Sequence, residues 1–236
     1  MACSEPRTVV DDRVKFSTLG PNSEGAIHDG NHALFGVSAG NSYFSRRHLT
    51  DVLTWATARF AAVDIVYADV ALEAMLEAFG YERSAARKSV AKQLSGTRRR
   101  IRGACDDIGA AAEKVRARPL SGFLADPGYQ EVRARTQTAL RTDVGLRAAQ
   151  DATAYQFLST RLGPAEMPAP AQVGAALAYV EAELPFVIDT PRILGVASSV
   201  HCYHSILPLG RLLFGDRPRG LKPADNQGYA IVECRD

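Results

Sequence analysis

Cysteine is scarce in this 236-residue sequence, and its four cysteines, Cys3, Cys105, Cys202 and Cys234, show no paired CxxC spacing. The simplest interpretation is a reduced, cytoplasmic protein without structural disulfides, although the sequence leaves bridges between distant cysteines open. Long apolar runs are also missing. None approaches the ~20 residues that a membrane-spanning helix requires, so we expect no membrane partner. The N-terminal region lacks a basic segment followed by an apolar stretch, so it does not predict a signal peptide.

The remaining composition is that of a globular protein, with 46% hydrophobic and 23% charged residues. Glycine and proline are not enriched enough for a fibrous or disordered chain. The length fits one domain with a substantial core. We expect residues 1–30, which are polar, to form a partly disordered N-terminal segment and residues 31–236 to form the domain.

Apolar patterns along the chain alternate between strand spacing and helix spacing. They predict strands over residues 32–37, 63–67, 193–196, with Val200 as an optional extension, and 229–234, and helices over residues 46–61, 70–79, 84–115, 127–139, 145–162 and 171–182. The initial order of strand, helix, strand and helix predicts a parallel sheet with crossover helices. We therefore expect an α/β fold, a single Rossmann-like domain with a central, mostly parallel sheet and an added helical layer.

The sequence Gly36-Val37-Ser38-Ala39-Gly40 overlaps the end of the first predicted strand and matches G-x-S-x-G. A serine flanked by glycines at a strand end can sit on a sharp turn, with its hydroxyl exposed and backbone N–H groups nearby. The carboxyl ends of strands in an open α/β sheet are where ligands bind. The motif also occurs by chance, so an ordinary structural turn is the alternative to a nucleophile.

A serine hydrolase of the α/β-hydrolase type is one interpretation of this motif, but the position of Ser38 argues against it. In that fold several strands, and the loop that supplies part of the oxyanion hole, precede the nucleophile. Here only 37 residues precede Ser38. The hydrolase order also needs an Asp and then a His downstream. His201 and His204 are present, but no Asp or Glu partner is legible for either.

Tyr179 and Glu183 are spaced i, i+4, so on a helix their side chains project from one face. A phenol beside a carboxylate suits a protonated α-amino group, because the carboxylate supplies charge and both groups accept N–H bonds. A solvated pair on a helix surface is the simpler alternative.

Three segments together resemble the cyclodipeptide synthase family. They are residues 36–45, 179–185 and 198–204, which occur in the family's order at suitable distances. The resemblance covers about residues 30–234 and implies a fold similar to the catalytic domain of class Ic aminoacyl-tRNA synthetases. The chain has no HIGH-like or KMSKS-like motif. The resemblance therefore implies that it uses amino acids already attached to tRNA, without ATP, metal or another cofactor.

The resemblance also implies roles for individual residues. Ser38 would be the nucleophile that receives the first aminoacyl group. Tyr179 and Glu183 would hold the ammonium of that group. Tyr203 would aid proton transfer or positioning during peptide bond formation and ring closure.

The segment around Tyr203 carries further signals. Asn41, Tyr203 and His204 resemble the subfamily that has Asn after the nucleophile, rather than the one with Pro after the tyrosine. Ile206 departs from the pattern, because an acidic residue is expected two places after the histidine. His201-Cys202-Tyr203-His204 also suggests metal ligands, but alternate side chains of a strand point to opposite faces and no second cluster supplies further ligands. We expect no bound metal.

The family's first side-chain pocket aligns with Gly36, Val66, Leu120, Phe186 and His201. Most of these residues are apolar, which favours a hydrophobic first amino acid, and His201 could accommodate a polar edge. The sequence does not name the product.

Positive charge is concentrated in one segment. The net charge is only +2, yet residues 83–118 hold eleven Lys/Arg and three Asp/Glu. Helical spacing places Val90, Leu94 and Ile101 on one side and a cationic ridge nearly opposite. Solvated helices tend to alternate charge sign, whereas no acid occurs over residues 83–102, so the ridge suits a phosphate backbone. A solvated face is the alternative. The resemblance implies that this ridge binds tRNA, through Lys88, Lys92, Arg98, Arg99, Arg100 and Arg102.

These features predict an aminoacyltransferase that uses two aminoacyl-tRNAs and releases a cyclic dipeptide through a ping-pong, acyl-enzyme mechanism. Two alternatives stay open. A non-catalytic tRNA-binding module would need the basic ridge but not Ser38, Tyr179 and Glu183 together, and a serine hydrolase would attack simple esters without tRNA. We expect a cytoplasmic monomer.

Overall fold

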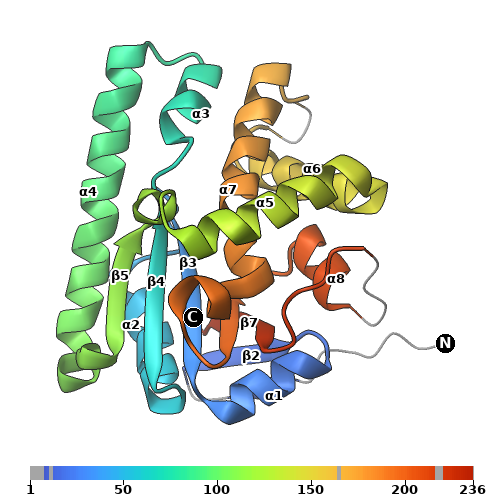
Figure 1. The fold of residues 1–236 in the computed structure, drawn as a ribbon. Coiled ribbons are helices and arrows are strands. Elements are labelled where there is room, and N and C mark those ends of the chain that lie inside the picture. The colour runs from blue at the N-terminus through green and yellow to red at the C-terminus, as the bar shows by residue number, and fades with distance from the viewer. Residues whose placement is uncertain (1–7, 11–12, 164–165, 216–219, 236) are drawn as a thin grey trace.

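The computed structural model describes residues 8–10, 13–163, 166–215 and 220–235. A seven-stranded sheet forms the centre, in the order β1-β2-β7-β6-β3-β4-β5. Figure 1 shows β3, β4 and β5 side by side. The strands from β7 to β5 are parallel, and β1 and β2 add an antiparallel edge, which confirms the expected α/β fold with a mostly parallel sheet. The strands are β1 (Thr8–Val10), β2 (Val14–Thr18), β3 (His32–Ser38), β4 (Ala62–Ala68), β5 (Val115–Pro119), β6 (Ser199–Tyr203) and β7 (Gln227–Cys234).

Helices cover both faces of this sheet. Helices α1 and α2 pack on one face, and α3, α5, α6, α7 and α8 pack on the other. Helix α4 contributes buried residues to both cores, and α5, α6 and α7 pack on one another as the expected added helical layer. The α-helices of the described residues are α1 (Pro21–Asp29), α2 (Arg46–Arg59), α3 (Leu72–Ala78), α4 (Arg83–Ile108), α5 (Pro127–Thr142), α6 (Val144–Ser159), α7 (Pro170–Leu194) and α8 (Pro208–Phe214).

The unit that positions the site is the crossover from β3 through α2 to β4. Both strands are almost entirely apolar and buried, as central parallel strands covered on two faces should be. Helix α2 begins where the Ser45 hydroxyl accepts the His48 backbone N–H, and it buries Leu49, Val52 and Leu53 against the sheet. Because β3 and β4 are parallel, Ser38 and Ala68 end side by side at the carboxyl edge of the sheet.

Within the segment over residues 1–30 that was expected to be partly disordered, Val14–Thr18 form β2 and Pro21–Asp29 form α1, two elements that the sequence patterns did not indicate. Strand β2 alternates buried Val14, Phe16 and Thr18 with more exposed residues and pairs with β7, a half-buried pattern that five residues display only weakly. The Ser23 hydroxyl of α1 accepts the Tyr229 backbone N–H, which ties the segment to the sheet. Residues 1–7 and 11–12 lie outside the described part of the chain.

Other differences from the expected elements have local causes. The helix expected over 84–115 ends at Ile108, because Gly109 has a φ of +59°, and a short 3-10 helix then leads into β5. Strand β5 was missed because it is a short edge strand that carries two arginines and ends in a proline, and its first residue fell within the expected helix. The strand expected over 193–196 was wrong, since residues up to Leu194 belong to α7 and Gly195 ends that helix with a φ of +67°. Helix α8 was also missed.

Helix α7 is longer than expected because it continues past two prolines. Pro185 and Pro191 lie inside it, and Asp189 leaves helical geometry, so the helix kinks there. By length and composition alone α7 could cross a membrane, and it is the one helix of the described residues that meets that test. Half of the most apolar 18-residue stretch of α7 is buried inside the domain, and the helix packs on α5 and α6. We therefore assign α7 as a core helix.

Candidate active site

Ser38 is the last residue of β3 and lies on a tight turn. The Asn41 backbone N–H donates to the Ser38 carbonyl over 3.3 Å, and Gly40 adopts a φ of +76° that favours glycine. A Cβ at Gly40 would lie 2.6 Å from Oε1 of Gln93, so helix α4 approaches the turn closely. The turn therefore holds Ser38 at the carboxyl edge of the sheet, where the sequence placed it, and brings it next to the basic helix.

Tyr179 is the hydrogen-bond partner of Ser38. Its phenolic oxygen lies 2.9 Å from Ser38 Oγ, and the contact is buried. The ring of Phe157 on α6 stacks on Tyr179 with 5.2 Å between centroids, which fixes the phenol in place. Burial and the nearby Glu183 carboxylate raise the pKa of Tyr179 well above 10, so the phenol keeps its proton at neutral pH.

Glu183 lies one helical turn after Tyr179 and faces the same region. Burial raises the pKa of its carboxyl to about 7, although hydrogen bonding with Tyr179 acts in the opposite direction. A carboxyl with this pKa exchanges a proton readily near neutral pH, and a bound cation would favour its ionised form. Ser38, Tyr179 and Glu183, predicted from separate segments, are thus brought together by β3 and α7.

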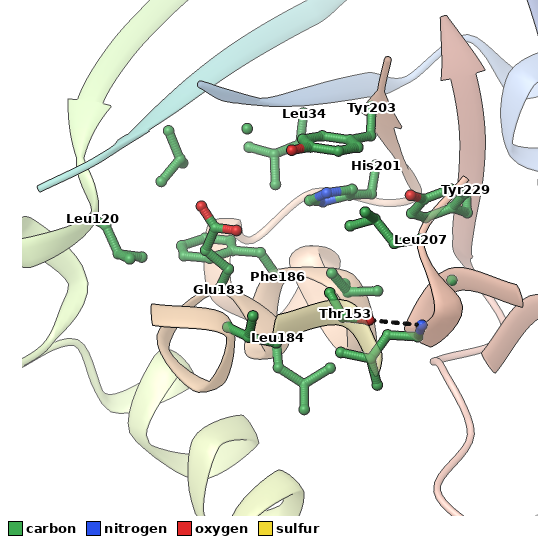
Figure 2. Close-up of a pocket in the computed structure, with 16 residues that line it drawn as sticks. Leu34, Leu120, Thr153, Glu183, Leu184, Phe186, His201, Tyr203, Leu207 and Tyr229 are labelled. Carbon is green, nitrogen blue, oxygen red and sulfur yellow. Dashed lines mark hydrogen bonds between the residues drawn. The ribbon is translucent and has the colours of Figure 1, made fainter. Parts of the chain in front are cut away.

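A cavity opens beside Glu183, on the face of the sheet covered by α7 (Figure 2). It contains about 650 Å³ of free space, part of which is open to solvent. Glu183 and Tyr203 line it, and a Cβ at Gly36 would meet nothing within 4 Å, so this glycine leaves the floor open. The structure brings all five predicted pocket residues to its wall, namely Gly36, Val66, Leu120, Phe186 and His201. It adds others that the sequence did not indicate, among them Leu34, Thr153, Leu207 and Tyr229.

Tyr203 stands on β6 at the rim of this cavity (Figure 2). Burial and the Glu183 charge raise its pKa, while hydrogen bonding with Ser38 lowers it. The phenol is therefore protonated at neutral pH and can donate a hydrogen bond beside Ser38.

Asn41 and His204 are linked through Tyr43, which the sequence did not indicate. The Asn41 side-chain oxygen accepts the Tyr43 backbone N–H over 2.9 Å. The Tyr43 ring stacks on His204 with 4.2 Å between centroids, and burial lowers the pKa of His204 to about 4. Asn41 and His204 therefore buttress the turn and the Tyr203 segment, and His204 is neutral at physiological pH. Ile206, where an acid was expected, lies in the segment between β6 and α8.

The predicted cationic ridge lies along α4. Lys88, Lys92, Arg98, Arg99 and Arg102 are exposed, whereas Arg100 is partly buried and donates to the Thr97 hydroxyl. Two further arginines at the start of α4, Arg83 and Arg87, form ion pairs with Glu77 and Glu73 of α3. The guanidinium of Arg98 lies 6.0 Å from the ring of Tyr67, whose strand ends beside Ser38. The ridge thus runs from the start of α4 past the nucleophile turn.

The described residues form neither the metal site nor the serine hydrolase site that were considered as alternatives from the sequence. Among the described residues no group of three or more His, Cys, Asp and Glu side chains could hold a metal ion, and Cys202 faces the opposite core from His201. Ser38 is hydrogen-bonded to a phenol rather than to an imidazole, unlike a hydrolase serine.

A Ser-His-Asp arrangement does exist elsewhere, in the core. His32 contacts Ser199 Oγ over 2.8 Å and Asp64 Oδ2 over 3.1 Å, and all three residues have no exposed surface. Asp64 also accepts from Arg116 and Arg118 of β5 over 2.7 and 3.1 Å. No substrate can reach this cluster, so its role is to join β3, β4, β5 and β6.

Comparisons with known proteins agree with the geometry of the site. A family model described as cyclodipeptide synthase matches residues 14–234. The cyclo(L-tyrosyl-L-tyrosyl) synthase of Mycobacterium tuberculosis is 41% identical over 207 residues, covering 87% of this chain and 71% of that protein. The cyclo(L-leucyl-L-phenylalanyl) synthase of Streptomyces noursei is 36% identical over 226 residues, covering 96% and 94%.

A solved structure shows the same fold. It is the Mycobacterium tuberculosis protein whose structure relates cyclodipeptide synthetases to type I tRNA synthetases, and it matches with a TM-score of 0.88 and 34% identity over 100% of this chain and 99% of that one. Fold, family model and relatives therefore agree along nearly the whole chain. The protein belongs to the cyclodipeptide synthase family, enzymes that form cyclic dipeptides from aminoacyl-tRNA substrates.

Proposed function

We propose that this protein joins two aminoacyl groups, each delivered as an aminoacyl-tRNA ester, with Ser38 as the covalent carrier of the first. The observation that carries the proposal is the 2.9 Å contact between Ser38 and Tyr179, together with Glu183 one helical turn later, which lines a largely apolar cavity. A hydroxyl for the acyl group, a carboxylate for its ammonium and a largely apolar cavity for its side chain are then present together.

The first step transfers an acyl group. Ser38 Oγ attacks the carbonyl carbon of the first aminoacyl-tRNA, the bond to the tRNA oxygen breaks, and the serine proton passes to that oxygen. The side chain enters the cavity, and the ammonium lies between the Tyr179 phenol and the Glu183 carboxylate. A carboxyl with a pKa near 7 can also accept a proton from the ammonium, which frees the amine that the next step needs.

The second and third steps form the ring. The amine of the acyl group on Ser38 attacks the ester carbonyl of the second aminoacyl-tRNA, and that tRNA leaves with the proton. The new terminal amine then attacks the Ser38 ester carbonyl, which releases the 2,5-diketopiperazine and returns the serine hydroxyl. Tyr203 beside Ser38 donates a hydrogen bond to the oxygen that gains charge in each attack. The ester bonds already store the required energy, so we propose that no metal, ATP or other cofactor takes part.

The exposed cations of α4 support tRNA as the carrier. Five of the six predicted ridge residues are exposed, and the helix lies against the nucleophile turn at Gly40. A phosphate backbone held by this ridge would bring its acylated end to Ser38. Such contacts carry no sequence information directly.

The test is covalent labelling with a radioactive aminoacyl-tRNA. The wild-type protein should retain the label, and Ser38→Ala should not, while still binding tRNA. Ser42→Ala, an exposed serine on the same segment, is the matched control and should label like the wild type. Equal labelling of Ser38→Ala would remove Ser38 from the mechanism.

The same experiment separates the alternatives. A non-catalytic tRNA-binding protein would bind the substrate without any label, and a serine hydrolase would be acylated by simple esters without tRNA. Cyclic dipeptides in the medium of an expressing bacterium, detected by mass spectrometry, would support the full reaction. Adding EDTA should leave product formation unchanged. The monomeric state and the cytoplasmic location stay predictions.

A further inference from the structure

His201 is a polar residue of the cavity that has no role in the proposed chemistry. It lies on β6, only 8% exposed, and its imidazole projects into the cavity beside Tyr203 (Figure 2). Its Nδ1 is buried and has no hydrogen-bond partner among the described residues. The ring of Tyr229 stacks on it with 5.7 Å between centroids and an angle of 15°, so the imidazole is held in one orientation.

A buried polar group without a partner is unusual in a folded protein. Such groups destabilise the fold unless a ligand or water satisfies them, and they are often found at functional sites. Burial lowers the pKa of His201 to about 4, so the ring is neutral at physiological pH and offers one donor and one acceptor nitrogen. His201 is therefore suited to a neutral hydrogen-bonding group and not to a carboxylate.

The other polar groups on the inner wall already have partners. The Thr153 hydroxyl donates to the Ala149 carbonyl and accepts from the Leu209 backbone N–H. The Tyr229 hydroxyl lies 3.5 Å from the Ser205 carbonyl, to which it donates. His201 is thus the available polar contact on an otherwise apolar inner wall.

The depth of His201 limits which side chains can reach it. Tyr203 stands at the rim, and His201 lies two residues earlier on the same face of β6, about 6–7 Å deeper along the strand. In register, His201 lies opposite Leu34, four residues before Ser38. If the amino acid is esterified to Ser38, the hydroxyl of a serine or threonine side chain would be too short to reach His201. A long, flat side chain could bring a polar tip to the imidazole.

We infer that the first pocket selects tyrosine, and that His201 hydrogen-bonds the phenolic hydroxyl while the apolar walls hold the ring. Phe186 and Tyr229 supply aromatic surfaces for a ring, which cationic and anionic side chains would not match. Phenylalanine would fill the same space and leave His201 without its partner. This inference rests on the proposed function, because the amino acid in the cavity is taken to be esterified to Ser38.

The experiment measures single-turnover acylation of Ser38, which reports on the first pocket without the second substrate. One tRNA body is charged with either tyrosine or phenylalanine, so that only the side chain differs. We expect tyrosine to react at least about tenfold faster, since a site that hydrogen-bonds a substrate hydroxyl discriminates against the analogue lacking it. The donor-free analogue 4-fluorophenylalanine should behave like phenylalanine.

Two matched variants test the role of His201. His201→Leu and His201→Asn are similar in size, but only the second can hydrogen-bond. The leucine variant should lose the preference, with a ratio near one or in favour of phenylalanine, and the asparagine variant should retain part of it. Phe186→Leu, which alters the wall without changing its polarity, should change both rates and leave their ratio near that of the wild type.

The outcomes are distinguishable. No labelling by any aminoacyl-tRNA would overturn the proposed function itself. Labelling of the wild type by phenylalanine or 4-fluorophenylalanine as fast as by tyrosine would overturn only the inference about His201. That comparison needs no variant, so it holds even if His201→Leu fails to fold. Preference for tryptophan over tyrosine would also contradict it.

Discussion

Glu183→Gln should separate the activity of the protein from its stability, because it removes a charge while keeping the shape of the side chain. In the proposed mechanism the carboxylate is the counter-charge of a buried ammonium. In the protein without substrate, the same carboxylate has no such cation. The substitution should therefore impair catalysis and stabilise the empty fold.

The structure gives the size of the stability effect. Burial raises the pKa of Glu183 from 4.5 to about 7, so at about 1.36 kcal/mol per pH unit the ionised carboxylate destabilises the empty protein by roughly 3 kcal/mol. The folded protein has the higher pKa, so it binds more protons than the unfolded chain between these values. The free energy of unfolding of the wild type therefore falls as the pH rises from 4.5 to about 7. The Glu183→Gln variant cannot ionise and escapes this loss.

The assay is urea unfolding of both proteins near pH 4 and at pH 8, together with single-turnover acylation and product formation. Near pH 4 the two free energies of unfolding should agree, and at pH 8 the variant should be more stable by up to roughly 3 kcal/mol. Activity should fall at least about 100-fold, since removing one partner of a buried charge pair typically costs about 3–5 kcal/mol. Glu181→Gln is the matched control. It lies two residues earlier, and its hydrogen bond with Gln137 survives the change, so its activity should persist.

Two results would refute this reasoning. If Glu183→Gln were less stable than the wild type at pH 8, the interactions of the carboxylate in the empty protein, such as that with Tyr179, would outweigh the cost of its burial. If the variant kept near-normal turnover, Glu183 would not hold the ammonium.

Three further predictions test other parts of the structure. Replacing Lys92, Arg98 and Arg99 together with Ala should lower the slope of log affinity against log salt by about 2–3 in tRNA binding, whereas replacing the ion-paired Arg83 and Arg87 should change it less. Asp64→Asn should lower the free energy of unfolding by about 1–3 kcal/mol in urea titrations, because the buried carboxylate joins three strands. Burial opposes the ionisation of Asp64, but His32, Arg116 and Arg118 outweigh it and lower its pKa, so this contribution should be present above the ordinary pKa and fade as the pH falls below it. Phe186→Ala should enlarge the first pocket and shift the product mixture, analysed by mass spectrometry, toward bulkier first residues.

The sequence-based predictions of secondary structure were most accurate for elements that show an apolar pattern within a short stretch of the chain. Strands β3 and β4 are continuous apolar runs, and α2 carries helical spacing, so the first crossover followed directly. Strand β5 could not be found in this way, because its two arginines are stabilised by Asp64, which is far away in sequence. The continuation of α7 past Pro185 was hidden for a similar reason. Buried contacts from elsewhere hold the helix together, such as the Tyr129 hydroxyl on the Ala182 carbonyl.

The residues of the candidate site also differ in whether the sequence revealed them. Ser38 was predicted from the glycines of its turn. The functional roles of Tyr179 and Glu183 were predicted from the family resemblance, because their spacing alone also fits a solvated pair on a helix surface. Tyr43, Phe157 and Tyr229 were not found, because each acts by stacking on a residue distant in sequence. Side-chain support of this kind leaves no periodic or motif signal in the chain.

Under the proposed function, the recognition of tRNA and the recognition of the amino acid take place at separate parts of the structure. Helix α4 reaches the nucleophile turn through Gln93 and presents exposed cations, so under the proposed function its contacts would be with phosphates and would favour any tRNA. The cavity extends along β3 and β6 on the face covered by α7, away from those cations, and its wall is apolar except at a few positions. Discrimination must then arise from the fit of the side chain, at about 1–3 kcal/mol for each methylene and more where a hydrogen bond is required. A tRNA charged with a foreign amino acid should therefore yield the product dictated by that amino acid. If the product followed the tRNA body instead, the ridge on α4 would have to read nucleotides.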